Sequence, residues 1–287
     1  MVFIKRFNLL DENNEHCILC YDETRRIFNN NYPIGLFSRK NFQSVEFDNI
    51  TIFYGGNGSG KTTLLNIISE KLGAIRKSSL SKGSFFEKYV NLCTYNMSLG
   101  EPDEIKIVSS DDVFDYLLDI RAINAGVNRK KERLSEEYMS TKFGNNNISL
   151  DNYEQLKNAY DSKSKTMSRY VRDRLGNNNI VEQSNGESAL MFWEKEIKEN
   201  GIYILDEPEN SLSAENQLKL KKYIEESVRF YNCQFIISTH SPFLLNLNEA
   251  KIYDLDETPV ITKKWTELKN VKLYYNFFKE RDAEFKI

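Results

Sequence analysis

The chain has 287 residues, of which 40% are hydrophobic and 28% charged, so it is long enough for one large domain or for a domain with a sizeable insertion. Its formal net charge is −3, so the overall charge gives no indication of nucleic-acid binding. Because no apolar run approaches the roughly 18 residues of a membrane span, and the first residues lack a secretory pattern, we expect a cytoplasmic protein.

The first part of the chain is predicted to form short strands and turns. The expected strands cover residues 16–21, 35–39, 44–47 and 49–55. The run from Ile50 to Tyr54 is apolar and β-branched, which is typical of a buried strand.

A single CxxC motif occurs at Cys17 and Cys20. Structural zinc sites usually need two such pairs, and the neighbouring His16 is expected on the opposite face of the predicted strand. Buried or free thiols are therefore favoured over a metal site.

A glycine-rich loop, GGNGSGKT, separates this strand from a helix predicted over residues 61–75. Its residues are Gly55, Gly56, Asn57, Gly58, Ser59, Gly60, Lys61 and Thr62, with Thr63 next. The pattern G-x-x-x-x-G-K-[ST] between strand and helix predicts a phosphate-binding loop. Lys61 would reach the β- and γ-phosphates of ATP, Thr62 would offer its hydroxyl to Mg²⁺, and Thr63 would contact the α-phosphate.

The middle of the chain is predicted to be helical. A strand over residues 104–110 precedes a helix capped by Ser110 or Asp111, and a second helix ends near residue 175. We interpret residues 111–178 as a helical hairpin with short arms, inserted into an α/β domain formed by residues 1–110 and 179–287. Between residues 121 and 174, twelve Lys and Arg outnumber seven Asp and Glu.

The remaining sequence alternates helices and strands. Helices are predicted over 189–199 and 213–231, and strands over 202–208, 234–240, 251–256 and 259–265. This alternation predicts a largely parallel sheet.

Polar residues follow two of the apolar strands. Asp206 and Glu207 end the strand IYIL, at the edge where open α/β sheets place ligands. Asp206 suits the Mg²⁺ shell, and Glu207 suits polarisation of the attacking water. His240, after the strand QFIIST, would sense the γ-phosphate.

In this order, the motifs resemble those of ATP-binding cassette (ABC) ATPases. The resemblance extends to about residue 265 and is closest to the non-transporter branch, which includes SMC-like and RecF-like proteins and AAA-family ATPases of bacterial phage defence. It implies a P-loop fold with a mixed sheet and an N-terminal antiparallel part. It also implies head-to-tail homodimers, in which Ser184 and Gly186 of the signature SNGES contact ATP bound to the other copy, with Glu209, Asn210 and Ser211 at the seam.

Two parts of the family pattern are missing. The signature lacks the two-glycine, glutamine-ended transporter form, and Gln155 and Gln183 come too late for a Q-loop, so Asp111 or Asp112 is the candidate replacement. No adenine-stacking residue is assigned. Tyr32, Phe37 and Phe42 are candidates, although core packing is the more common role of such rings.

These features predict a Mg²⁺-dependent ATPase that controls a nucleic-acid-linked or anti-phage defence effector, such as a nuclease. The positive hairpin could contact DNA or form an ordinary solvated face. The main alternative is the nucleotide-binding subunit of a membrane ABC transporter, which the signature and the missing Q-loop disfavour. A slow ATP-binding switch is disfavoured by the presence of both Lys61 and Glu207.

Overall fold

The computed structural model describes residues 2–21, 31–80, 82–98, 100–143, 153–175 and 185–286. The chain forms two compact units, one of residues 1–114 with 185–287 and the other of residues 115–184. The domain limits inferred from the sequence stay a prediction. None of the described helices is long and apolar enough to cross a membrane.

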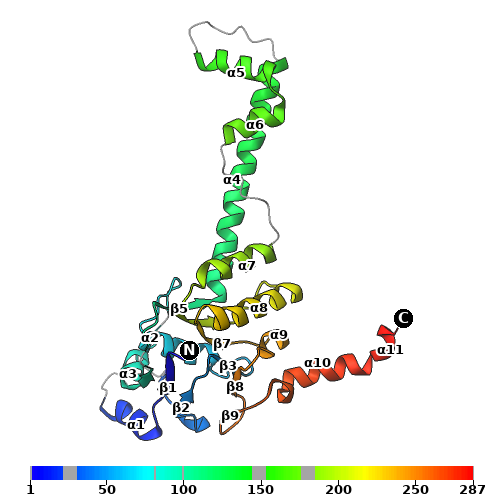
Figure 1. Ribbon diagram of the computed structural model, residues 1–287. Coiled ribbons are helices and arrows are strands. Elements are labelled where there is room, and N and C mark those ends of the chain that lie inside the picture. Colours follow the sequence, from blue (N-terminus) through cyan, green and yellow to red (C-terminus); the bar gives the residue numbers. More distant parts are fainter. Residues whose placement is uncertain are drawn as a thin grey trace. The chain divides into compact units, whose positions relative to one another are not determined.

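In the described residues, the first unit contains a six-stranded sheet (Figure 1). Its strands, in spatial order, are β5 (Glu104–Ser109), β6 (Gly201–Asp206), β7 (Gln234–Ser238), β3 (Ile50–Tyr54), β8 (Lys251–Asp254) and β9 (Ile261–Thr262). The first five are parallel and β9 is antiparallel, which confirms the predicted mixed sheet. Because parallel strands end at one edge, Asp206 lies opposite Ser238 there.

A smaller antiparallel sheet confirms the predicted N-terminal β part. Its order is β2 (Ser44–Glu46), β1 (Ile4–Asn8) and β4 (Thr94–Met97). One face packs on the core through Ile4, Phe7 and Val45, while Lys5 and Arg6 are exposed. These charges interrupt the apolar pattern, so β1 was not recognised in the sequence.

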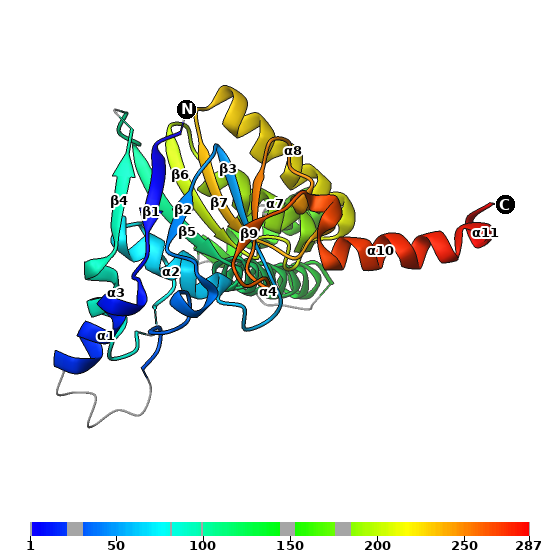
Figure 2. The same ribbon diagram turned by 90° about the horizontal axis from the view of Figure 1, so that it is seen from below.

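Helices cover both faces of the large sheet (Figure 2). Ile202 and Ile204 of β6 share a core cluster with Leu64 and Leu65 of α2, while α8 covers the other face and packs against α7. The helices around the large sheet are α2 (Lys61–Lys71), α3 (Phe86–Leu92), α7 (Asn185–Glu196), α8 (Ala214–Phe230) and α9 (Pro242–Leu245). The C-terminal part contains the short helix η3 (Trp265–Glu267), then α10 (Lys269–Glu280) and α11 (Asp282–Phe285).

Several local predictions in the first unit were wrong. Residues 16–21 belong to helix α1 (Glu12–Tyr21), so His16 and Cys20 share a face, with Nδ1 and Sγ 3.3 Å apart. The segment predicted as a strand over 35–39 instead forms turns and the short helix η2 (Ser38–Lys40). Short apolar runs do not distinguish helix from strand, because both structures can bury them.

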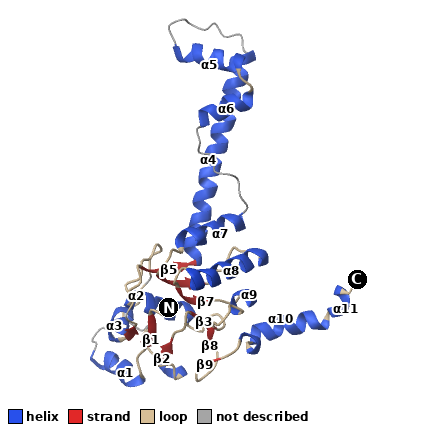
Figure 3. Cartoon of the chain, in the orientation of Figure 1, coloured by secondary structure: helices blue, strands red, loops and turns tan. Residues whose placement is uncertain are grey.

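The second unit is helical in its described part, and every described strand lies in the first unit (Figure 3). Helix α4 (Ser110–Phe143) begins in the first unit and is followed by α5 (Tyr153–Ser164) and α6 (Met167–Leu175). With 34 residues, α4 is about 50 Å long, so the prediction of two short arms was wrong for the first arm. The second arm is broken between α5 and α6, where the Tyr138 hydroxyl donates a hydrogen bond to the Lys165 carbonyl (3.1 Å).

Candidate functional site

The glycine-rich loop forms a tight cradle at the end of β3. Gly58 and Gly60 have φ angles of +79° and +105°, which L side chains rarely adopt. Lys61 begins α2 and is buried, and its ammonium group donates to the carbonyl oxygens of Gly55 (2.9 Å) and Gly56 (3.2 Å). The loop therefore places a positive charge and a helix N-terminus inside one concave turn.

Two further observations show that the cradle fits a phosphate group. The Ser59 hydroxyl is buried and has no hydrogen-bond partner among the described residues. A Cβ atom on Gly55 would lie 2.6 Å from that hydroxyl, so a side chain there would fill the cradle. An unpaired buried hydroxyl is costly, and an oxygen-rich ligand would satisfy it.

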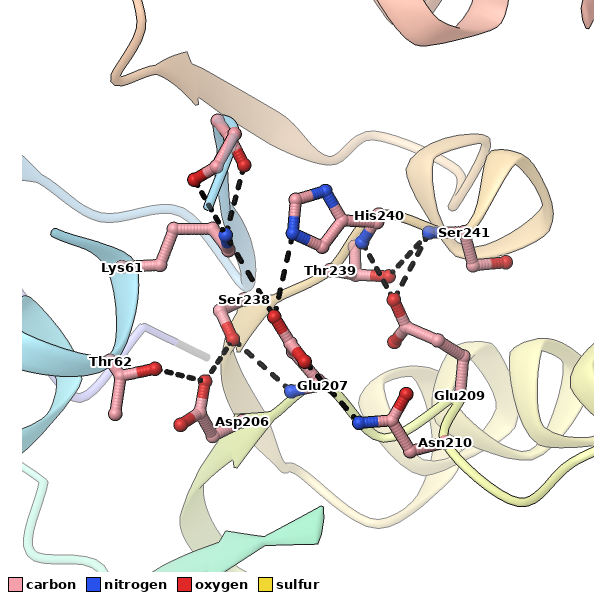
Figure 4. A network of polar contacts seen from close by, with 12 residues as sticks. Lys61, Thr62, Asp206, Glu207, Glu209, Asn210, Ser238, Thr239, His240 and Ser241 are labelled. Carbon is pink, nitrogen blue, oxygen red and sulfur yellow. Dashed lines mark hydrogen bonds and ion pairs between the residues drawn. The ribbon is translucent and has the colours of Figure 1, made fainter. Parts of the chain in front are cut away.

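Asp206 is held by two hydroxyl groups at the end of β6. The Thr62 hydroxyl donates to Oδ1 at 3.3 Å, and the Ser238 hydroxyl donates to the same oxygen (Figure 4). Burial raises the pKa of Asp206 above its usual value, and these hydrogen bonds offset part of the shift. A divalent cation beside Thr62 and Asp206 would favour the ionised carboxylate, so the residues fit the predicted Mg²⁺ position.

Glu207 lies between Lys61 and His240, the two residues that are predicted to contact the phosphates (Figure 4). Its Oε1 atom is 3.8 Å from Lys61 Nζ and 3.4 Å from His240 Nε2. Its backbone has a φ of +49°, and its N–H donates to the Ser238 carbonyl at 3.0 Å. Positive φ at a residue with a side chain costs about 1–3 kcal/mol, and such strain is concentrated at functional sites.

The backbone around His240 is fixed by Glu209. Oε1 of Glu209 accepts hydrogen bonds from the N–H groups of His240 (2.6 Å) and Ser241 (3.1 Å). Burial raises the pKa of Glu209. Burial, together with the positive charge of Lys61, lowers the pKa of His240, so the imidazole is neutral near pH 7.

The sequence predicts Glu209, Asn210 and Ser211 together at a dimer seam, but their side chains differ in direction and exposure. Glu209 points inward to the His240 segment, whereas Asn210 is exposed and its Nδ2 atom lies 3.3 Å from Glu207 Oε2. Ser211 is exposed. The role of Glu209 had no signal in the sequence, since it depends on the pairing of β6 with β7.

The predicted signature is described only in part. Ser184 lies outside the described residues, and Gly186 is in the first turn of α7. Of the proposed Q-loop replacements, Asp111 is exposed, while Asp112 is buried and accepts hydrogen bonds from the Ser109 N–H (2.8 Å) and hydroxyl (2.9 Å). Asp112 therefore caps the start of α4.

The three residues considered for adenine stacking differ in burial. Phe37 and Phe42 are buried in the core, which confirms the packing interpretation for both rings. Tyr32 is partly exposed, and its hydroxyl lies 2.6 Å from that of Thr63, beside the glycine-rich loop.

A protein-family model matches part of the chain. Residues 185–245, which contain Asp206, Glu207 and His240, match the family model described as the AAA ATPase domain. This match confirms the predicted resemblance to AAA-family ATPases. A search of curated proteins found no match for this chain.

Solved structures show a distant likeness. The SMC head domain from Thermotoga maritima is 16% identical, with 91% of this chain and 99% of that chain covered and a TM-score of 0.41. A Pyrococcus furiosus Smc head with an extended coiled coil, bound to the C-terminal domain of ScpA, is 15% identical, with 98% and 100% covered and a TM-score of 0.44. A putative metal-chelate type ABC transporter is 15% identical, with 82% of both chains covered and a TM-score of 0.37. These low values carry no functional conclusion and do not favour the transporter alternative.

Proposed function

We propose that this ATPase hydrolyses Mg²⁺-bound ATP at a site completed by a second copy of the chain, and that the cycle controls a nucleic-acid-linked or anti-phage defence effector. One observation carries the hydrolytic part of the proposal: the Glu207 carboxylate contacts both Lys61 and His240 at the edge of the sheet. A general base must lie within reach of the proton that it accepts, and Glu207 lies beside the two residues proposed to contact the phosphates.

Each residue then has a distinct task. Lys61 leaves its loop carbonyls to contact the phosphates, and Glu207 polarises the attacking water. His240, held neutral by its surroundings, can accept or donate a hydrogen bond near the γ-phosphate. Thr62 and Asp206 would hold Mg²⁺, which supplies charge neutralisation at the phosphates when bound.

The second copy would contribute its signature residues, Ser184 and Gly186. The position of Gly186 in the first turn of α7 supports this proposal, because the N–H groups of a first helical turn attract anions. The resulting dimer would be isologous, with two equivalent sites.

The helical segment 111–178 is the proposed output surface. The excess of positive charge between residues 121 and 174 is compatible with a polyanionic partner, although the acidic first turns of α4 nearly cancel it over the whole segment. Helix α4 begins at the end of β5, where Ser109 is paired with Asp206. A movement of Asp206 that accompanies nucleotide binding would therefore be transmitted to α4 through the paired strands β6 and β5.

Light scattering tests the proposal. Glu207→Gln should retain ATP binding but lose the water-polarising carboxylate, so its mass should double from 33.6 kDa when Mg-ATP is added. Adding Ser184→Arg should abolish the shift, whereas Ser140→Arg, at an exposed position of α4, should not. A Glu207→Gln protein that stays monomeric at saturating Mg-ATP would refute the dimeric site. In single-turnover assays, wild-type protein should hydrolyse ATP only with Mg²⁺, and Glu207→Gln should not.

A further inference from the structure

Helix α10 has a broad apolar surface that the described part of the chain leaves exposed. Five of its large side chains are about half exposed or more: Leu273, Tyr274, Tyr275, Phe277 and Phe278. At 100° per residue, the apolar side chains occupy one arc that Asn270 alone interrupts, and Lys269, Lys272, Asn276, Lys279 and Glu280 form the polar stripe opposite. Figures 1 and 2 show α10 extending away from the sheet of its own unit.

One edge of this arc lines a groove that leads to the candidate site. Val271, Tyr274, Tyr275 and Phe278 recur at the spacing of one helical face and form one wall of a cavity of about 630 Å³. Phe243 and Trp265 are among the residues of the other walls, and Glu207 and His240 are among the polar residues that line it. The groove is therefore continuous with the side of Glu207 where the proposed chemistry takes place.

The extent of the apolar surface indicates a protein partner rather than a small molecule. An aromatic side chain buries roughly 150–250 Å², so five half-exposed side chains would bury about 500 Å². That is more than half of the roughly 800 Å² that each partner contributes to a standard interface. A small ligand could fill the groove, but it would leave Leu273 and Phe277 exposed, because they lie outside the groove on the same arc.

The position of the groove identifies the partner. Its lining includes Glu207, His240 and Asn210, which the proposed function places where two copies meet. An unrelated protein bound in the groove would compete with the second copy for the surface around Glu207. The second copy itself can cover the candidate site and the groove in one contact. Symmetry would then bury two α10 helices and two grooves for each dimer.

We propose that α10 is a docking helix for the second copy, and that its apolar arc and the adjoining groove are buried when the ATP-bound dimer closes. This inference rests on the proposed function. Burial of the groove would also exclude bulk water from the Glu207 and His240 side chains, which strengthens electrostatic interactions in the site.

The test uses the Glu207→Gln chain as the parent. We would add Phe278→Glu on the apolar arc or, as a matched control, Asn276→Glu on the polar stripe, and measure mass by light scattering over a series of protein concentrations. With Mg-ATP, Phe278→Glu should raise the concentration for half-dimerisation by at least about tenfold, while Asn276→Glu should leave it unchanged. Binding of fluorescent ATP to the diluted monomers should be equal in all three proteins.

The outcomes separate the two proposals. If the parent does not dimerise with Mg-ATP, the dimeric site and the docking role both fail. If the parent and Phe278→Glu dimerise equally, only the docking role of α10 is refuted, and a different protein becomes the candidate occupant.

A second measurement does not depend on the stability of that variant. A photoreactive phenylalanine analogue at position 278 should give an adduct of two copies in purified protein with Mg-ATP, and the same analogue at position 276 should not. A parent dimer that gives no adduct from position 278 would overturn the inference.

Discussion

Glu209 offers a sharp test of how the backbone at His240 is held. Its Oε1 atom accepts from the N–H groups of His240 and Ser241, and the Ser241 N–H has a second acceptor in the Thr239 hydroxyl at 3.0 Å. Glu209→Ala therefore removes the acceptor of the His240 N–H in the described structure. An unpaired buried donor costs about 1–3 kcal/mol, so we expect a loss of about 2 kcal/mol in the free energy of unfolding. For a chain of this size, that lowers Tm by roughly 4–8 °C.

Glu209→Gln is the matched control, because its amide oxygen can accept the same bonds without a buried carboxyl group of raised pKa. We expect its Tm to stay within about 3 °C of the wild type. Single-turnover ATP hydrolysis should fall at least about tenfold in Glu209→Ala, as the imidazole loses its position beside Glu207, and should change little in Glu209→Gln. Equal Tm values and equal rates for the two variants would refute this account.

Three other predictions follow from the same contacts. Gly60→Ala should weaken ATP binding at least about tenfold, because a φ of +105° costs a side chain about 1–3 kcal/mol, whereas Gly126→Ala, with open space around it in α4, should bind normally in the same titration. The pKa of His240 is lowered in the folded chain, so the unfolded chain binds a proton on this imidazole at a higher pH than the folded chain does. Lowering the pH from 7.5 to 5.5 should therefore reduce Tm more in the wild type than in His240→Gln. Equal Tm profiles against pH for the two proteins would contradict this prediction. Glu196→Ala should destabilise the protein by about 2 kcal/mol in urea unfolding, because the buried Lys106 ammonium loses its nearer carboxylate at 2.8 Å and keeps only the Glu104 carboxylate at 3.6 Å. A change below about 0.5 kcal/mol would show that Glu104 or water replaces Glu196.

The centre of the fold could be predicted because buried parallel strands are apolar along their whole length. Residues 50–54, 202–205 and 235–237 are largely apolar runs, and the last two lead directly into polar residues. The position of these residues at one sheet edge, and the contacts between Lys61, Glu207 and His240, follow from that topology.

Other features depend on contacts that a sequence pattern does not contain. Residues 17–20 are equally compatible with a helix and a strand, and only packing makes them part of α1. The inward direction of Glu209 depends on the neighbouring strand, and the exposure of α10 cannot be distinguished from a buried amphipathic helix by periodicity. The roles of Ser184 and Gly186 stay predictions, as do the functions of the site residues.

The strand order also has a consequence for biosynthesis. Strand β7 lies between β6 and β3, so two strands made earlier meet only through one that emerges from the ribosome after residue 233. Until then β3 and β6 each present an unpaired apolar edge, and such edges invite aggregation or chaperone binding. A nascent chain that ends before β7 should therefore be unable to bind nucleotide, although its complete phosphate loop has already been made. Nucleotide binding would thus report that synthesis has passed β7.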